Sequence, residues 1–331
     1  MKKLLLIFII LFSLSAKSQN SKEIFTMFYN VENLFDTIND LFTQDEEFLP
    51  SSRKAWDTEK YTHKMKQLTK VFSSINNNKY PNLIGLCEIE NKSVIEDLLK
   101  EPFFKDHNYT IIHKNSPDSR GMDCALLFDK NFELLNHDFI EVKIPDAGTT
   151  RDIVYVQLKL REDIFHVFVN HWPSRWGGEK KTEHKRVFVS SILREYIDQN
   201  IEDDQFIIIM GDLNDYPSNK SVRDVLVKKD LTNLVLQKEW MDIGSYNWNN
   251  EWNFLDHIIV SNNFLSGKSK IQVKDFNVLN KEWMLYTKKN GKKCPNRTYG
   301  GSNWYGGFSS ILAPIVKASG TFILNFSHII K

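Results

Sequence analysis

The sequence predicts an α/β protein whose β-sheet mixes parallel and antiparallel strands, and three observations support that fold class. Short apolar segments with the length of strands recur along the chain. Some neighbouring segments are close enough for hairpins, whereas others are separated by segments that read as helices. Five of the apolar segments end in a short polar motif. A sheet that combines hairpins with helix-linked crossovers is mixed rather than purely parallel.

Helices are predicted at four places. The clearest is Lys54–Ile75, where apolar residues recur at intervals of three and four and Asp57 is a suitable N-cap. The other three are Val94–Leu99, Lys181–Gln199 and Val222–Val227.

Strands are predicted at eight apolar segments: Ile24–Phe28, Asn82–Cys87, Asp123–Phe128, Phe139–Val142, Ile153–Leu160, Ile164–Asn170, Phe206–Met210 and Phe254–Val260. Only Arg161–Asp163 separates the fifth from the sixth, and this short polar link predicts a hairpin. Phe206–Met210 contains only hydrophobic residues, which is typical of a strand buried on both faces.

The composition bounds the class of protein. The chain has 331 residues, of which 41% are hydrophobic and 26% charged, as in ordinary globular proteins. It shows no repeat, low-complexity tract or Pro/Gly-rich linker, so we expect one domain over residues 22–331 and a monomer. The net charge of +1 excludes a global attraction to nucleic acid, so any polyanion must bind to a local basic patch.

The N-terminus has the pattern of an export signal. Lys2 and Lys3 precede the apolar run Leu4–Leu14, which is too short to span a membrane, and Ala16–Ser18 is a small-x-small cleavage site. We expect residues 1–18 to be a signal peptide and the mature protein to be periplasmic or secreted, without a membrane span. An uncleaved anchor is the alternative reading.

Three cysteines are present, and no two of them form a C-x-x-C pair, so a cysteine-based zinc site is not expected. They are Cys87, Cys124 and Cys294. The first two lie in apolar segments and are most simply buried thiols, although the sequence leaves a disulfide between them open.

Polar motifs at the ends of strands carry the candidate chemistry: Tyr29–Asn33, Cys87–Asn91, Asn170–Arg175, Gly211–Asp215 and Leu255–His257. Strands deliver such side chains to one rim of a sheet, where α/β proteins build their sites. Carboxylates there suit Mg²⁺, and amides and imidazole suit phosphoryl oxygens. The motifs therefore predict a cation and a phosphate group at one place.

Each motif also has a plainer reading. Glu88 ends an apolar strand, where a carboxylate is costly without a cation or hydrogen bonds, but it could be an exposed strand end. Asp212 and Asn214 are two residues apart and point the same way, although Gly, Asp and Asn also form turns. His171 could be structural, and His257 should face away from Asp256 because successive strand residues alternate.

A local basic cluster follows His171 and consists of Arg175, Lys180, Lys181, Lys185 and Arg186. A rim that faces phosphate needs such a cluster, so we predict that Arg175 and Arg186 bind substrate. A solvated helix face is the alternative for the lysines.

Taken in this order, the motifs resemble the endonuclease/exonuclease/phosphatase superfamily, which contains deoxyribonuclease I and exonuclease III. The resemblance covers nearly the whole mature chain, and Tyr29–Phe35 and Asn170–Gly178 resemble its exported bacterial branch. It implies a four-layer sandwich of two mixed β-sheets flanked by helices. It also implies a Mg²⁺- or Mn²⁺-dependent hydrolase of phosphodiester bonds, most simply an endonuclease-like enzyme, with nucleic acid or another phosphoester as substrate.

The resemblance assigns roles to individual residues. Glu88 resembles the metal-binding Glu, with Asn30 beside it, and His171 resembles the His that contacts the scissile phosphate. Asp212 and Asn214 resemble the pair that orients the nucleophile and the phosphate. Two further candidates are the Asp that precedes the last strands, Asp256, and the substrate-contacting Arg, Arg120.

One motif departs from the family pattern. The family ends in Ser-Asp-His, but here Ser309 is followed by Ser310 and Ile311. Neither side chain can act as a general base, and loss of that base typically costs about 10²–10⁴ in rate. Two alternatives follow: a catalytically silent protein that binds phosphate or nucleic acid, and a lipid or sugar phosphatase.

Overall fold

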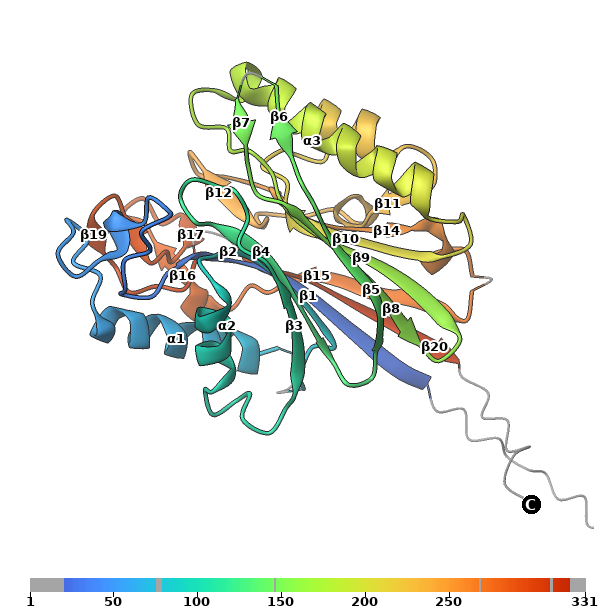
Figure 1. Ribbon diagram of the computed structural model, residues 1–331, viewed down its shortest axis with the longest axis horizontal. Coiled ribbons are helices and arrows are strands. Elements are labelled where there is room, and N and C mark those ends of the chain that lie inside the picture. Colours follow the sequence, from blue (N-terminus) through green and yellow to red (C-terminus); the bar gives the residue numbers. More distant parts are fainter. Residues whose placement is uncertain (1–20, 76–78, 146, 268, 310–311, 322–331) are drawn as a thin grey trace, which may run out of the picture.

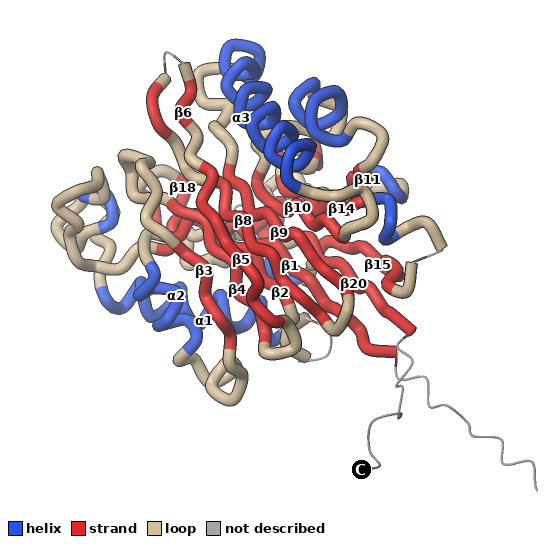
Figure 2. Tube along the Cα trace, turned by 45° about the vertical axis from the view of Figure 1, so that its right-hand side comes forward, coloured by secondary structure: helices blue, strands red, loops and turns tan. Residues whose placement is uncertain are grey.

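The computed structural model describes residues 21–75, 79–145, 147–267, 269–309 and 312–321. Two six-stranded sheets lie face to face, and helices cover their outer surfaces (Figures 1 and 2). The described chain is therefore a four-layer α/β sandwich, which confirms the fold class that the sequence predicts.

The first sheet has the order β15-β20-β1-β2-β4-β3. Its strands are β1 (Ser21–Leu34), β2 (Leu83–Ile89), β3 (Tyr109–His113), β4 (Asp123–Asp129), β15 (Ile271–Val278) and β20 (Pro314–Thr321). The strands β1 and β2 run parallel, and the other pairs are antiparallel.

The second sheet has the order β11-β14-β10-β9-β8-β5. Its strands are β5 (Glu133–Ile140), β8 (Ile153–Leu160), β9 (Asp163–His171), β10 (Phe206–Asp212), β11 (Leu231–Asn233) and β14 (Asp256–Ser261). Here β9 and β10 are parallel and the other pairs antiparallel, and β8 and β9 form the predicted hairpin. Both sheets are mixed, as predicted.

The principal helices are α1 (Thr58–Ser73), α2 (Lys92–Leu99), α3 (Glu179–Asn200) and a π-helix (Ser221–Val227). α1 and α2 cover the first sheet, and α3 covers the second (Figure 1). α1 begins later than predicted because Asp57 caps it by accepting the Lys60 N–H at 3.0 Å, and Ala55 before the cap has a positive φ. The last predicted helix forms with π rather than α geometry.

Short elements complete the structure. Four hairpins are β6 (Lys143–Ile144) with β7 (Gly148–Thr149), β12 (Tyr246–Trp248) with β13 (Glu251–Asn253), β16 (Leu285–Thr287) with β17 (Lys293–Pro295), and β18 (Tyr299–Gly300) with β19 (Asn303–Trp304). Short 3₁₀ turns lie at Glu46–Phe48, Leu234–Gln237, Asn262–Phe264 and Glu282–Met284.

The sequence prediction misplaces one strand and misses others. The strand predicted at Phe139–Val142 is part of β5, which begins at Glu133 and ends at Ile140. Its residues are mostly exposed on both faces, so no alternation of apolar and polar residues marks it. The strands β3, β11, β15 and β20 lie outside the predicted segments, because their apolar residues are few or interrupted by polar and charged residues.

Close packing joins the two sheets behind the polar rim. A Cβ built on Gly85 of β2 would lie 2.3 Å from the Met210 Sδ of β10, so a larger residue here would force the Met210 side chain to move. Buried residues from both sheets form one core between them, and a second core lies between the second sheet and α3. These two cores fix the relative position of the strand ends that carry the polar motifs.

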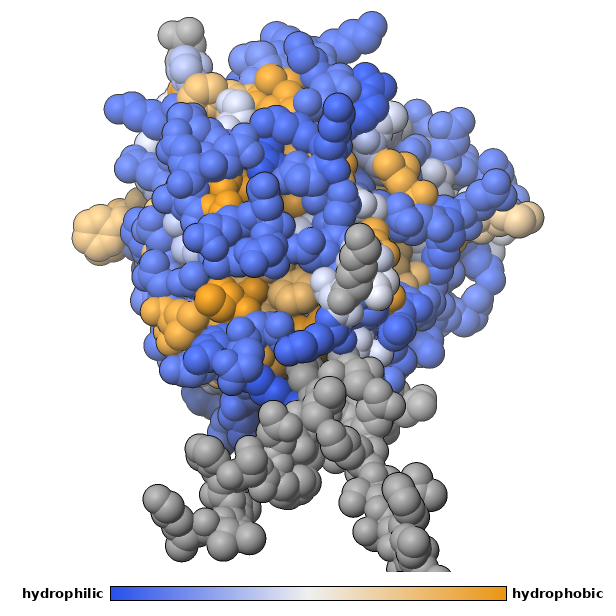
Figure 3. Space-filling model, turned by 90° about the vertical axis from the view of Figure 1, so that its right-hand side faces the viewer, coloured by the Kyte–Doolittle hydropathy of each residue, from blue (hydrophilic) through white to orange (hydrophobic). Residues whose placement is uncertain are grey.

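Several sequence predictions fall outside the described residues, namely the signal peptide over residues 1–18 and the substituted motif at Ser310 and Ile311. Within the described part of the chain, no helix is both long and apolar enough to cross a membrane. All three cysteines are free thiols, although Cys87 and Cys124 are opposite each other on β2 and β4. The end of the sandwich where β1 begins and β20 ends has a largely hydrophilic surface, with separate apolar patches among the polar residues (Figure 3).

Candidate active site

Strand register brings the polar motifs together. On the second sheet, Asp212 at the end of β10 is opposite His171 of β9 on one side and Asp256 of β14 on the other. On the first sheet, Asn30 of β1 and Glu88 of β2 come from neighbouring parallel strands. These ends of the two sheets meet, so five of the predicted site residues gather in one region.

Asn30 links the two sheets. Its amide nitrogen donates to Glu88 Oε1 at 3.0 Å and to Asp212 Oδ2 at 3.1 Å, and its side-chain oxygen accepts the Glu32 N–H at 2.9 Å. The side chain is 1% exposed, so these contacts are shielded from water. Asn30 therefore holds two carboxylates at a fixed separation.

Glu88 lies at an irregularity of β2, where its backbone has a positive φ of 63° and the pairing with β1 and β4 shifts register. Bulges of this kind turn a side chain that would otherwise follow the sheet. Its Oε2 accepts the Asn33 N–H at 2.9 Å, and Asn33 itself has a positive φ. The strained backbone thus aims a partly exposed carboxylate into the site.

His171 is buried, and its Nε2 lies 4.0 Å from Glu88 Oε1. Burial lowers its pKa well below the ordinary value, and the positive charges of Arg151 and Arg120 lower it further. The imidazole is therefore neutral at neutral pH, with one N–H to donate and one nitrogen to accept. The Nδ1 atom has no hydrogen-bond partner among the described residues.

Two carboxylates stand side by side at the centre of the site. Asp212 is 4% exposed, and burial together with the charge of Glu88 raises its pKa to about 7. Asp256 is fully buried, and burial and the charge of Asp212 raise its pKa well above the ordinary value, an effect that nearby Ser245 offsets only in part. Both Asp256 oxygens lack a hydrogen bond of good geometry among the described residues. Like charges on opposed strand positions repel each other, so this pair favours a shared proton or a cation.

Asn214 belongs to a tight turn after β10. It has a φ of 51°, its backbone N–H donates to Asp212 Oδ1 at 3.0 Å, and its side-chain nitrogen donates to the Trp172 carbonyl at 2.9 Å. Asn is among the few residues that tolerate this conformation. The interpretation of Gly211–Asp215 as a turn therefore holds, and the catalytic role of Asp212 and Asn214 stays a prediction.

His257 faces the other side of the second sheet, as strand alternation predicts. Its Nδ1 contacts the Asn233 amide at 3.0 Å and its Nε2 contacts the Asp215 carbonyl at 2.9 Å. It is therefore held in the protein interior away from Asp256.

Two of the three arginines predicted to bind substrate, Arg175 and Arg186, are bound by other groups of the protein. Arg186 is fully buried and pairs with Asp215 at 2.7 Å, so it anchors α3 to the loop after β10 and does not face a substrate in this structure. Arg175 donates through Nε to the Asn214 carbonyl at 2.7 Å and its guanidinium lies 3.8 Å from the Tyr216 ring centroid. Arg175 therefore supports the Asn214 turn.

Arg120 lies at the edge of the site and remains about half exposed, paired with Asp118 at 3.4 Å. Asp118 also binds Arg151 at 3.0 Å, and Arg151 donates to the Trp172 carbonyl at 2.9 Å. The sequence analysis missed Arg151, whose only signal is a charge two residues before the apolar segment Ile153–Leu160. Its buried positive charge adds to the lowering of the His171 pKa and partly opposes the rise in the Asp212 pKa.

A second missed residue is Lys64, which is fully buried on α1. Its ammonium donates to Thr298 Oγ1 at 2.5 Å and to the Phe308 carbonyl at 3.0 Å, and burial lowers its pKa to about 8. Ser309, which follows Phe308, donates its hydroxyl to the Asn30 carbonyl at 2.9 Å. Lys64 thus holds the segment that precedes the substituted motif. Its sequence signal is a lysine on the apolar stripe of a helix.

The donor set fits a hard divalent cation by charge and atom type. Glu88, Asp212 and Asp256 are carboxylates in one region, and a cation among them would relieve the repulsion that, after burial, raises the pKa values of Asp212 and Asp256. Within the described ranges, however, no three Asp, Glu, His or Cys side chains are arranged as a metal site. The Asn30 amide nitrogen faces the two carboxylates, so Asn30 positions them in this structure. To ligate a cation directly, as the sequence predicts, its side-chain oxygen would have to turn away from the Glu32 N–H toward the carboxylates.

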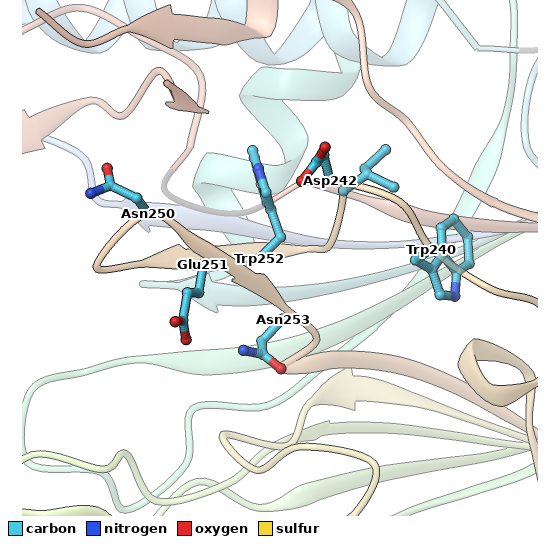
Figure 4. A pocket seen from close by; sticks show the side chains of 7 residues that line it. Trp240, Asp242, Asn250, Glu251, Trp252 and Asn253 are labelled. Atoms are coloured by element: carbon cyan, nitrogen blue, oxygen red, sulfur yellow. The ribbon is translucent and has the colours of Figure 1, made fainter. Parts of the chain in front are cut away.

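A separate hollow of about 370 Å³ lies along the β12–β13 hairpin. Its lining includes Trp240, Asp242, Trp252 and Glu251, and the last two point to opposite sides of β13 (Figure 4). It contains none of the five gathered residues, so it is not the reaction centre.

Comparison with known proteins places this site in a family. The model of the endonuclease/exonuclease/phosphatase family matches residues 25–317, which is most of the chain. The chain belongs to this family. No match was found among curated proteins. Family members act on phosphoester bonds and typically use divalent metal ions, so the chain is assigned to a superfamily of nucleases, phosphodiesterases and phosphatases.

Solved structures of the endonuclease/exonuclease/phosphatase family have the same fold. A family protein from Bacteroides thetaiotaomicron is 14% identical with a TM-score of 0.59, covering 91% of this chain and 98% of that one. TDP2 of D. rerio, complexed with a single-strand DNA product, is 13% identical with a TM-score of 0.57, covering 89% and 98%. A mannosyl-6-phosphatase from B. thetaiotaomicron is 15% identical with a TM-score of 0.56, covering 89% and 99%. At these identities the likeness shows the fold alone.

Proposed function

We propose that this protein is a metal-dependent phosphodiesterase, most simply a nuclease, that uses Mg²⁺ or Mn²⁺. The observation that carries the proposal is the bridge from Asn30 to both Glu88 and Asp212, beside a neutral His171. This arrangement joins carboxylates from two sheets in a buried place, which is costly unless it serves a cation or a substrate.

Each side chain has a role that follows from its geometry. Glu88 and Asp212 would hold the cation, which when bound would supply positive charge to the phosphoryl oxygens. His171 would donate its N–H to a non-bridging oxygen, because it is neutral and one nitrogen is unengaged. Asp212 would orient the attacking water, and Asn214 would contact the phosphate through its remaining amide hydrogen.

Hydrolysis of bis(p-nitrophenyl) phosphate and nicking of plasmid DNA test the proposal. The protein without residues 1–18 should cleave one or both with Mg²⁺ or Mn²⁺ and lose at least about 10²-fold in kcat on Asp212→Ala or His171→Ala. Asp224→Ala, an exposed aspartate on the π-helix, is the matched control and should keep wild-type rates. An Asp212→Ala enzyme as fast as wild type would refute the site.

A silent binding protein is the second candidate, and the sequence at Ser310 and Ile311 favours it. If wild type binds an oligonucleotide without cleaving it, the double substitution Ser310→Asp with Ile311→His should restore turnover. If that variant still binds the oligonucleotide but does not cleave it, the protein serves binding alone.

A lipid or sugar phosphatase is the third candidate, since one fold neighbour is named as a mannosyl-6-phosphatase. Release of phosphate from p-nitrophenyl phosphate or mannose 6-phosphate, faster than from the diester, would favour it.

We further propose export of the chain through residues 1–18, which N-terminal sequencing of protein recovered outside the cytoplasm would test.

A further inference from the structure

The β16–β17 hairpin concentrates positive charge at one place. Residues 285–297 contain four lysines and one arginine and no acidic residue, so this segment contributes +5 to a chain whose net charge is only +1. The turn reads Lys-Lys-Asn-Gly-Lys-Lys over residues 288–293, and Gly291 adopts the positive φ that such a turn requires. The rest of the chain is therefore net acidic, and a polyanion would be attracted to this hairpin.

Two of the lysines are occupied and two are not. Lys293 pairs with Glu282 at 2.7 Å, and Lys288 donates to the Asn250 side chain at 3.0 Å. Lys289 and Lys292 are exposed, and neither ammonium has an ion-pair or hydrogen-bond partner within the described part of the chain. The occupied pair fixes the hairpin against its neighbours, and the free pair is presented to solvent.

Exposed aromatic rings accompany the free lysines. Tyr286 on β16 is 55% exposed, and Trp248 on the adjacent β12 is 61% exposed. The Lys288–Asn250 contact and the neighbouring strands β12 and β17 place the two hairpins side by side. Exposed ammonium groups and exposed aromatic rings on the same pair of hairpins are the combination that binds the phosphates and unpaired bases of single strands.

The hairpin is directly connected to the candidate active site. Beyond β17 the chain reaches Arg297 and Thr298, which contact the Glu32 carboxylate at 3.3 Å and 2.6 Å. Glu32 in turn donates its N–H to Asn30, the residue that bridges the carboxylates. Figure 1 shows β12, β16 and β17 together at the end of the sandwich where β1 and β2 finish.

Charges of the site also reach the neighbouring hairpin. Burial raises the pKa of Tyr246 on β12, Asp212 adds to the rise, and Arg297 and Arg175 oppose it. Tyr246 therefore lies near Asp212 of the site and near Arg297, which follows β17.

We propose that the β16–β17 hairpin is a docking surface for single-stranded nucleic acid that leads into the candidate active site. Lys289 and Lys292 contact backbone phosphates, and Tyr286 and Trp248 stack on bases. This inference rests on the proposed nuclease function and extends it by naming the substrate class. A chain of near-neutral net charge needs a local basic patch to bind a polyanion. Because Arg186 is buried, we assign that patch to this hairpin.

The test compares Lys289→Glu/Lys292→Glu with a control pair of equal charge change. Lys130 is exposed directly after Asp129, at the opposite end of β4 from the site, and Lys105 is exposed two residues before His107, whose ring lies 4.0 Å from Asp129, so Lys105→Glu/Lys130→Glu is the matched control. For a labelled single-stranded 20-mer, the hairpin variant should raise Kd and KM by at least about tenfold. It should also lower the slope of log Kd against log salt by about 1.4, since each lost phosphate contact accounts for about 0.7. The control should behave as wild type.

Hydrolysis of bis(p-nitrophenyl) phosphate separates this inference from the proposed function. The hairpin variant should cleave this small diester within twofold of wild type, because the diester is too small to reach the hairpin. If no variant cleaves any phosphoester, the proposed function fails, and the oligonucleotide Kd, measured by fluorescence anisotropy, still decides the inference. Equal Kd and salt slope in the hairpin variant and the control would overturn it.

A second pair of variants tests the stacking. Tyr286→Ala and Trp248→Ala should each weaken binding of the single-stranded 20-mer by about fivefold or more, since stacking on one base contributes about 1–3 kcal/mol. Binding of the corresponding duplex should change less than twofold. Equal losses on single strand and duplex would overturn the single-strand assignment.

Discussion

The opposed carboxylates at the centre of the site make a sharp prediction about Asp212→Asn in metal-free protein. The folded state raises the pKa of Asp212 from the ordinary 3.8 to about 7, because the carboxyl is buried beside Glu88. The folded protein therefore holds this proton more tightly than the unfolded chain does. Folding takes up a proton between about pH 4 and pH 7, so this group's contribution to the free energy of unfolding falls as pH rises through that window.

The size of the effect follows from the shift. About three pKa units at about 1.4 kcal/mol each give up to about 4 kcal/mol of destabilisation above pH 7. Asparagine has nearly the same shape and cannot ionise, so the variant should escape this cost. It loses one acceptor for the Asn30 amide, which should cost about 1 kcal/mol at every pH.

Thermal unfolding in EDTA at pH 5 and pH 8 measures the effect. We expect Asp212→Asn to be close to wild type at pH 5 and more stable by several degrees at pH 8. Adding Mg²⁺ at pH 8 should raise the Tm of wild type and not of the variant. The difference between variant and wild type removes the contribution of titrating groups outside the site, such as Glu90, and it includes the change at Asp256, whose pKa the charge of Asp212 raises. A difference that is independent of pH, or a variant less stable at pH 8, would refute the reasoning.

Three further predictions test the assignments around the site. Arg186→Met should lower the free energy of unfolding by about 3 kcal/mol in urea titrations, because Asp215 loses its buried ion pair with Arg186. KM should change less than twofold, and a large rise in KM would instead indicate that Arg186 binds substrate. Gly211→Ala should destabilise by about 1–3 kcal/mol because its Cβ would lie 2.4 Å from the Asn170 carbonyl oxygen, and a wild-type melting curve would contradict this packing. His171 should show no NMR titration between pH 6 and 8, because burial and nearby arginines lower its pKa well below the ordinary value; a midpoint near 6.5 would show that the ring is solvated.

The candidate site could be predicted in outline because its residues end strands. An apolar segment followed by a carboxylate, amide or imidazole is visible in the sequence, and strand ends meet at a sheet rim. The roles of Arg186 and Arg151 could not be predicted, because a sequence does not show which arginine is buried by a distant segment. Arg186 on α3 meets Asp215 after β10, and Arg151 meets Asp118 across 33 residues.

The sequence by itself determined the fold class, the order of most elements and the chemical types gathered at the site, since these depend on local periodicity and on residues next to one another. The tertiary structure decided which side chains touch. Asn30 bonds Asp212 across 182 residues, and the positive φ of Glu88 turns its carboxylate toward them. Burial and strand register are long-range properties, so the raised pKa of Asp212 and the neutral His171 could emerge only after both sheets had packed.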